Sequence, residues 1–136
     1  MGDNTYIAVV DDDIGVCTSL SRLLRLAHLQ PITYLSAEAF LADAKRPKFD
    51  CLVLDVRLGG MSGLDLFAQL AAEQTHPPVI FITAVDEPAA RARAEALGCA
   101  GFFVKSTPGA GIIEAICRAT RDPGELTHRP PSHGVV

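Results

Sequence analysis

The 136-residue sequence has little of three things: basic charge, long apolar runs and closely spaced cysteines. Its net charge is −4, whereas a nucleic-acid-binding domain normally presents a basic face, so we expect no nucleic-acid partner for this domain. No apolar stretch approaches the roughly 20 residues of a membrane span, and the N-terminus has no signal-peptide pattern. We therefore expect a cytoplasmic protein without a membrane partner.

The four cysteines, at positions 17, 51, 99 and 117, form no CxxC pair and no Cys/His cluster with zinc spacing. This pattern excludes the common zinc motifs and favours buried free thiols in a reducing compartment. The rest of the composition, 49% hydrophobic and 21% charged residues, is typical of one globular domain with a substantial core.

Short runs rich in Val, Ile and Phe alternate with segments of helical periodicity. The strand-like runs lie at 6–10, 31–35, 51–54, 79–82 and 101–104. The helical patterns lie near 14–28, 37–45, 63–74, 87–97 and 108–121. This alternation predicts an α/β domain over residues 1–121, with a five-stranded parallel sheet and helices on both faces. Residues 122–136, which contain Pro and Gly without periodicity, are predicted to form a mobile C-terminal tail.

Polar residues follow four of the five predicted strands. Asp11 and Asp12 end the first strand, Asp55 the third, Thr83 the fourth and Lys105 the fifth. In open α/β sheets this carboxyl edge is where ligands bind. Two carboxylates about 4 Å apart repel by roughly 4 kcal/mol at an effective dielectric near 20. A hard divalent cation relieves such repulsion, so the three acids predict a Mg²⁺ site. A hydroxyl and an ammonium group beside it are suited to phosphoryl transfer onto a carboxylate.

Four segments, in this order, resemble the motifs of the response-regulator receiver domain of two-component phosphorelay systems. They are VVDDD at 9–13, LVLDVRLGGMSG at 52–63, FITA at 81–84 and FFVKS at 102–106. The resemblance covers residues 5–121. It implies a doubly wound, flavodoxin-like sheet with the strand order 2-1-3-4-5.

The resemblance also implies a role for each acid. Asp55 is then the phosphoacceptor, and Mg²⁺ is bound directly by Asp12, Asp55 and the backbone carbonyl of Arg57. Asp11 is implied to hold the metal through water. Asp13 matches a third acid of the family with a less direct role, and the sequence also allows it to cap the first helix.

The same resemblance implies a switch. Thr83 and Lys105 bind the phosphoryl oxygens, and Phe102 is the aromatic residue that rotates inward when Thr83 moves. The surface of the fourth helix, fifth strand and fifth helix then changes shape. The implied partners are a sensor histidine kinase or a histidine phosphotransfer protein and, after phosphorylation, a second copy of the chain through that surface.

Two residues depart from the family pattern. Gly59 stands where the family usually has proline, which predicts a more mobile loop. Ser106 stands where a cis proline usually follows the lysine, and a cis bond before another residue costs roughly 2.5–4 kcal/mol. We therefore expect the Lys105–Ser106 bond to be trans.

The sequence thus predicts a phosphoacceptor signalling switch that catalyses only its own phosphorylation and dephosphorylation, and no turnover enzyme. Two alternatives remain at this stage. A phosphatase of the haloacid-dehalogenase type also uses a D-x-D pattern after its first strand, but here only Glu114, Asp122 and Glu125 follow Lys105 as further acids. A receiver-like binding module that is not phosphorylated is the other alternative, and Gly59 and Ser106 keep it open.

Overall fold

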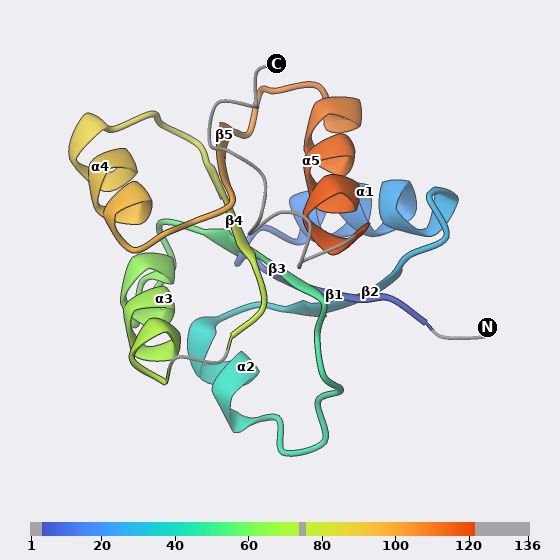
Figure 1. The fold of residues 1–136 in the computed structure, drawn as a ribbon, viewed down its shortest axis with the longest axis horizontal. Coiled ribbons are helices and arrows are strands. Elements are labelled where there is room, and N and C mark those ends of the chain that lie inside the picture. Colours follow the sequence, from blue (N-terminus) through green and yellow to red (C-terminus); the bar gives the residue numbers. More distant parts are fainter. Residues whose placement is uncertain (1–3, 74–75, 122–136) are drawn as a thin grey trace.

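The computed structural model describes residues 4–73 and 76–121, which form a parallel sheet between two layers of helices (Figure 1). Its strands are β1 (Tyr6–Val10), β2 (Gln30–Tyr34), β3 (Cys51–Asp55), β4 (Val79–Thr83) and β5 (Gly101–Val104). The helices are α1 (Ile14–Leu26), α2 (Ala37–Ala42), α3 (Gly63–Ala72), α4 (Pro88–Ala96) and α5 (Gly109–Arg121). The strand order, β2-β1-β3-β4-β5, confirms the predicted fold class.

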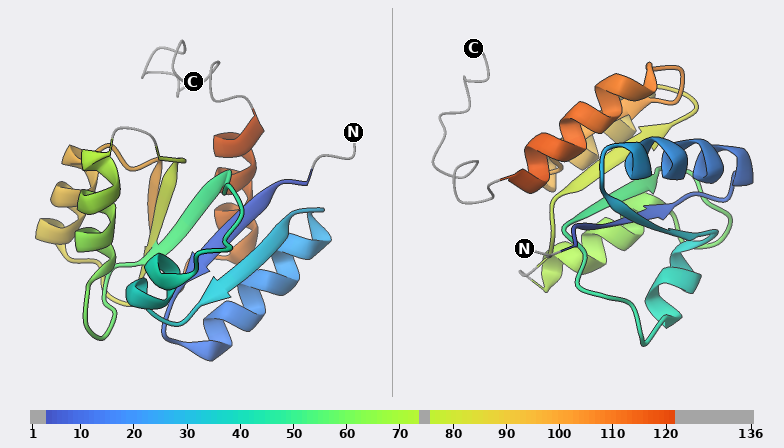
Figure 2. Two further views of the ribbon diagram at one scale, coloured as in Figure 1. Left: turned by 90° about the horizontal axis from the view of Figure 1, so that it is seen from below. Right: turned by 90° about the vertical axis from the view of Figure 1, so that its right-hand side faces the viewer.

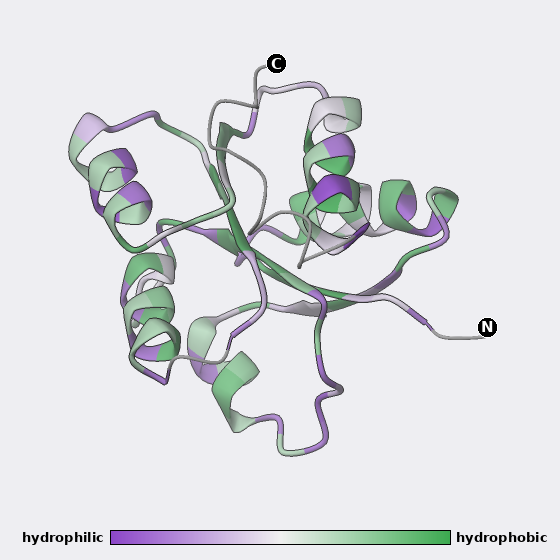
Figure 3. Cartoon of the chain, in the orientation of Figure 1, coloured by the Kyte–Doolittle hydropathy of each residue, from purple (hydrophilic) through white to green (hydrophobic). Residues whose placement is uncertain are grey.

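The sheet separates two apolar clusters, because alternate strand residues point to opposite faces. Ile7 and Val9 of β1 pack with α1 and α5, whereas Ala8 and Val10 pack with α2, α3 and α4. Figure 2 shows α1 and α5 together on one side of the sheet, and Figure 3 shows how strongly hydrophobic the strands between the layers are. Strands covered on both faces explain the nearly continuous apolar runs of the sequence.

Side-chain caps fix where three of the helices begin. Asp13 Oδ1 accepts a hydrogen bond from the backbone N–H of Gly15 (2.9 Å), so the capping role that the sequence allowed for Asp13 is present. Ser36 caps α2 and Ser62 caps α3, each by accepting a backbone N–H at 3.0 Å. α1 and α2 thus begin shortly after their strands, whereas residues 56–62 lie between β3 and α3.

Four helices end earlier than the periodicity predicts: α3 at Ala72, α4 at Ala96, and α1 and α2, whose ends have identifiable causes. The chain leaves α1 at Leu26, because His28 adopts a left-handed conformation (φ 66°) and the Leu29 N–H returns to the carbonyl of Leu24. The chain leaves α2 at Ala42, because the Asp43 side chain accepts the Tyr34 hydroxyl (2.6 Å). Strand β2 also ends one residue early, at Tyr34.

Several other expectations can be compared with the fold. All four cysteines are free; Cys17 and Cys51 are buried, while Cys99 and Cys117 are only partly buried. Among the described residues no helix has the length and apolar character needed to cross a membrane. The predicted tail at 122–136 lies outside the described residues.

Candidate functional site

The three acids predicted at the carboxyl edge of the sheet lie together. Asp11 and Asp12 directly follow β1, and Asp55 is the last residue of the neighbouring strand β3. Carboxylate oxygens of the three side chains lie within 4.8 Å of one another. Asp11 and Asp55 are buried, while Asp12 is exposed, so the cluster opens to solvent on the side of Asp12.

Lys105 joins this cluster from β5, although β4 lies between β5 and β3. Its Nζ atom is 3.0 Å from Asp55 Oδ2 and donates a second hydrogen bond to Asp11 Oδ1 at 3.2 Å. No peptide bond among the described residues is cis, so the Lys105–Ser106 bond is trans as expected, and the lysine still reaches both acids.

The pKa values of Asp55 and Lys105 are both raised, but for different reasons. Burial raises the pKa of Asp55 to about 6, because it outweighs the hydrogen bond from Lys105, which lowers it. Burial would lower the pKa of Lys105, but its hydrogen bonds to Asp55 and Asp11 raise it overall. Lys105 is therefore a cation at neutral pH, and Asp55 is a carboxylate that is costly to keep ionised.

The donor set fits a hard cation. Within the described part of the chain, Asp11 Oδ2 is a buried side-chain atom without a hydrogen-bond partner, although Lys105 Nζ lies 3.0 Å away. An oxygen in that position, beside carboxylates from Asp12 and Asp55, is suited to Mg²⁺ and its bound water. The Arg57 N–H donates to Asp55 Oδ1 (3.1 Å), so the backbone of Arg57 also folds against the cluster.

Thr83 lies at the end of β4, beside β3, and is almost fully buried. Its hydroxyl donates to the carbonyl of Val85 at 3.0 Å. The side chain is therefore held by the loop that leads to α4 and does not cap that helix, whose N-cap residue is Glu87. A ligand oxygen near Asp55 would compete with the Val85 carbonyl for this hydroxyl.

Phe102 of β5 is buried in the apolar cluster beneath α4. Its ring centroid lies 6.0 Å from that of Phe81, and the guanidinium of Arg91 lies 4.6 Å above it. In this structure the ring already lies inside, and the rotation expected on phosphorylation stays a prediction. Sequence reasoning missed the Arg91 cover, since nothing in the pattern of α4 distinguishes Arg91 from its exposed neighbour Arg93.

The residues on which a phosphatase interpretation would depend do not join the acids. Asp13 caps α1, and Glu114 pairs with Arg118 on the exposed side of α5. The other two acids considered for that interpretation, Asp122 and Glu125, lie outside the described residues. Among the described residues, the acidic cluster consists of Asp11, Asp12 and Asp55.

The chain between Asp55 and α3 passes very close to the site. A Cβ added at Gly63 would lie 2.0 Å from the carbonyl oxygen of Asp55, so only glycine fits there. Gly60 has a φ of 81°, and Glu38 Oε2 accepts the N–H of Met61 at 2.8 Å. Sequence reasoning missed Glu38, because it lies on α2 and belongs to no motif that points to Asp55.

With this geometry in view, a comparison with known families decides the assignment. The family model of the response regulator receiver domain matches residues 7–117, most of the chain. The chain belongs to the response-regulator receiver family. Receiver domains of response regulators are signalling domains.

Individual receiver domains are similar in sequence and in fold. Nodulation protein W of Bradyrhizobium diazoefficiens is 37% identical to this chain, and the match covers 84% of this chain and 50% of the relative. The transcriptional regulatory protein FixJ of Azorhizobium caulinodans is 36% identical, and the match covers 85% of this chain and 55% of the relative. The chain thus spans about half the length of the curated relatives that it matches. The crystal structure of FixJ-N superimposes with a TM-score of 0.78 at 33% identity, covering 88% of this chain and 95% of that one.

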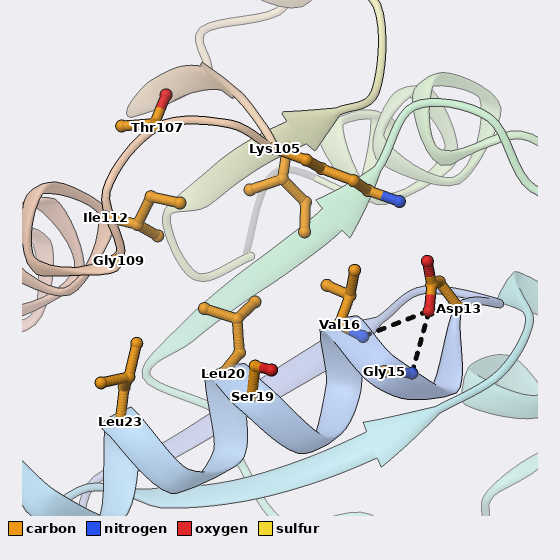
Figure 4. Close-up of a pocket in the computed structure, with 11 residues that line it drawn as sticks. Asp13, Gly15, Val16, Ser19, Leu20, Leu23, Lys105, Thr107, Gly109 and Ile112 are labelled. Carbon is orange, nitrogen blue, oxygen red and sulfur yellow. Dashed lines mark hydrogen bonds between the residues drawn. The ribbon is translucent and has the colours of Figure 1, made fainter.

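A pocket of about 460 Å³ adjoins the site of this receiver domain, between α1 and α5. Figure 4 shows Lys105 at one end of it and Leu23 on α1 at the other. Val16, Leu20 and Leu23 of α1 and Ile112 of α5 form its apolar walls, and its polar lining residues are Asp13, Ser19, Lys105 and Thr107. The pocket therefore extends the charged cluster into an apolar groove.

Proposed function

We propose that Asp55 accepts a phosphoryl group from a phosphohistidine of a sensor kinase or a phosphotransfer protein. The observation that carries this proposal is the placement of Asp55: a buried carboxylate held by Lys105, with Asp11 and Asp12 close enough to share a cation. A carboxylate with these neighbours has a nucleophilic oxygen and groups that balance charge on an incoming phosphoryl group.

In this reaction an Asp55 carboxylate oxygen attacks the phosphorus, and a new O–P bond forms. The P–N bond to the partner's imidazole breaks, and its electron pair stays on the ring nitrogen. Lys105 is placed to meet the negative charge of the phosphoryl oxygens, because its Nζ atom already contacts Asp55. Water later hydrolyses the acyl phosphate, which releases inorganic phosphate and regenerates the Asp55 carboxylate.

Mg²⁺ is the proposed cofactor, held by Asp12, Asp55 and the Arg57 carbonyl, with Asp11 acting through water. When bound, the ion neutralises charge on the phosphoryl oxygens. The exposed position of Asp12 gives the ion an open route from solvent.

Recognition of the partner is proposed to use the groove between α1 and α5. It adjoins Lys105, and its apolar lining from Leu20, Leu23 and Ile112 offers a surface for a partner helix. A helix docked there would bring its phosphohistidine to the end of the sheet where Asp55 lies.

The output step is proposed to begin at Thr83. A phosphoryl oxygen on Asp55 would draw the Thr83 hydroxyl away from the Val85 carbonyl and release the loop that leads to α4. The surface of α4, β5 and α5 would then change, and a partner or a second copy of the chain would dock on it. The phosphoryl group can shift this equilibrium only as far as it binds the two states unequally.

Intact mass after incubation with a small acyl phosphate and Mg²⁺ tests the proposed function. One phosphoryl adduct per chain is expected in the wild type, none in Asp55→Asn, and an unchanged adduct in Asp65→Asn, a matched exposed acid on α3. Equal labelling of Asp55→Asn and the wild type would contradict the assignment. Absence of labelling in all three would favour the binding module that is not phosphorylated.

A further inference from the structure

We propose that Glu38, in the first turn of α2, is a positioning residue for phosphotransfer because it holds the loop between Asp55 and α3. This loop, residues 56–62, is named the phosphoacceptor loop below. The inference rests on the proposed function and assigns to α2 a part in it.

The contact that carries the inference joins two elements. Glu38 Oε2 accepts the backbone N–H of Met61 at 2.8 Å. This hydrogen bond lowers the pKa of Glu38, and Met61 is the main cause of that shift. The acceptor is therefore ionised at neutral pH, and bonds from N–H groups to carboxylates are stronger than those between neutral groups.

Helix α2, which carries Glu38, is held in place by core packing and by its N-cap. Ala37 and Phe40, on either side of it in α2, are buried in the apolar cluster, and Ser36 caps the helix. Glu38 itself is exposed at the start of the helix. The hydrogen bond to Glu38 thus connects the phosphoacceptor loop to a helix that is anchored in the core of the domain.

The loop needs such a connection because it contains two adjacent glycines. Nothing lies within 4 Å of a Cβ added at Gly59, so a side chain there would meet only open space. A Cβ added at Gly60 would lie 2.6 Å from Glu38 Oε2, and Gly60 has a left-handed φ of 81°. The backbone therefore passes directly against the carboxylate, and its left-handed conformation favours glycine at this position.

The ends of the loop are fixed at the site itself. The Arg57 N–H donates to Asp55 Oδ1, and the Gly63 N–H donates to the Val56 carbonyl. The Arg57 side chain also pairs with Glu87 at the N-cap of α4, and Leu58 and Met61 pack against the apolar cluster. Among the hydrogen bonds of the described residues, the bond from Met61 to Glu38 joins the middle of the loop to another element. By restricting this middle part, Glu38 limits the directions that the Arg57 carbonyl, a proposed metal ligand, can take.

Two substitutions separate the hydrogen bond from the charge. Glu38→Gln keeps an acceptor oxygen and removes the charge, whereas Glu38→Ala removes both. Glu95→Ala, on the exposed side of α4, removes the same charge far from the loop and serves as the control. Glu38→Ala should speed amide exchange in the loop and weaken Mg²⁺ binding, followed by NMR titration, by about threefold to tenfold. Glu38→Gln should have a smaller effect than Glu38→Ala, because a neutral acceptor keeps the hydrogen bond in a weaker form, and Glu95→Ala should stay near the wild type.

A second pair of variants tests the same contact from the loop side. Gly60→Ala should displace the Glu38 carboxylate and reproduce the Glu38→Ala result, whereas Gly59→Ala, where there is open space, should not. The melting temperature of Glu38→Ala should stay within about 2 °C of the wild type, so that the effect on Mg²⁺ is not a loss of stability.

The outcomes separate this inference from the proposed function. Equal effects of Glu38→Gln and Glu38→Ala would overturn the positioning role in favour of a general charge effect. Unchanged loop exchange in Glu38→Ala would overturn it as well. Absence of phosphorylation in the wild type would instead overturn the proposed function, while loop exchange and Mg²⁺ affinity would still decide whether Glu38 holds the loop.

Discussion

Two sets of ion pairs in this domain have the same chemistry and very different surroundings. Lys105 pairs with Asp11 and Asp55 at the end of the sheet, where the exposed fractions of the side chains are 20%, 0% and 5%. Around α4, Arg91 pairs with Asp86 and Arg93 pairs with Asp65, and these side chains are 37–57% exposed. The N–O distances of the two sets are similar, at 3.0–3.2 Å, so the sets differ mainly in their exposure to solvent.

The difference shows where charge has a structural use and where it has a chemical one. An exposed pair contributes about 0.2–1 kcal/mol and is screened by salt. A buried charge that loses its partner destabilises a protein by about 3–5 kcal/mol. The arginine pairs near α4 thus orient neighbouring elements at little cost, whereas the lysine makes it tolerable to bury two acids side by side.

Removing the buried cation should have the largest effect. Lys105→Met should lower the free energy of unfolding by about 3 kcal/mol in buffer without Mg²⁺, because Asp11 and Asp55 then face each other without a cation. Urea unfolding at pH 7 measures this loss. A loss below about 1 kcal/mol, the range of exposed pairs, would show that the site is screened by solvent despite its burial.

Asp55 should make stability depend on pH with a defined sign. Its pKa is raised to about 6, so between about pH 4 and pH 6 the folded chain keeps a proton that the unfolded chain has released. Stability without Mg²⁺ should therefore fall as pH rises through this range. Asp55→Asn should remove the fall and be up to about 3 kcal/mol more stable at pH 7.

Unfolding curves of both chains from pH 4 to pH 7 check this prediction. Asp65→Asn, whose wild-type side chain has a lowered pKa because of its hydrogen bonds from Arg93 and Ser62, is the control with the opposite sign. Parallel curves for the wild type and Asp55→Asn would contradict the expected role of burial.

Arg91 should have an intermediate effect, because it combines an exposed pair with a ring contact. It makes two contacts to Asp86, at 3.2 and 3.3 Å, and covers the Phe102 ring. Arg91→Ala should cost about 1 kcal/mol and shift the aromatic NMR signals of Phe102. Arg91→Lys should preserve little of the ring contact, because it lacks the planar guanidinium. Unshifted Phe102 signals would show that the guanidinium does not cover the ring in solution.

Arg93 should have the smallest effect. It makes one contact, at 3.2 Å to Asp65 on α3, between side chains that are about half exposed. Arg93→Ala should cost about 0.2–0.5 kcal/mol at low salt, and less when salt is added. Urea unfolding at two ionic strengths measures this. A loss as large as that of Lys105→Met would remove the distinction between the two sets.

The fold was largely predictable because strands covered on both faces have an unmistakable composition. The bounds of β1 and β5 agree with the predicted runs at 6–10 and 101–104. The ends of α1 and α2 were not predictable, because they depend on single residues in unusual roles. His28 has a left-handed conformation, which is more usual for glycine. Asp43, which follows α2, accepts a hydrogen bond from the hydroxyl of Tyr34 on β2.

The acidic cluster was predictable for a topological reason. In a parallel sheet the carboxyl ends of neighbouring strands meet at one edge, so Asp11, Asp12 and Asp55 had to be close. The direction of the Thr83 hydroxyl, the burial of Phe102 and the approach of Glu38 depend on side-chain packing between distant elements, which no local pattern records. The metal-binding roles of the acidic cluster and of Arg57 stay predictions, and so do the switch roles of Thr83 and Phe102.

The two apolar clusters described above have a consequence for how this sequence can vary. Thr83 and Val85 lead toward α4, and the clustered side chains of Phe81, Phe102 and Ala94 lie on that same side of the sheet. The opposite cluster, with Leu24, Ile112 and Ile116, is separated from them by the strands. Mutations that exchange volume among the residues beneath α1 and α5 can therefore accumulate without disturbing the packing around Phe102. Because the sheet separates the two clusters, the residues of one cluster can be substituted, in evolution or by design, independently of those of the other.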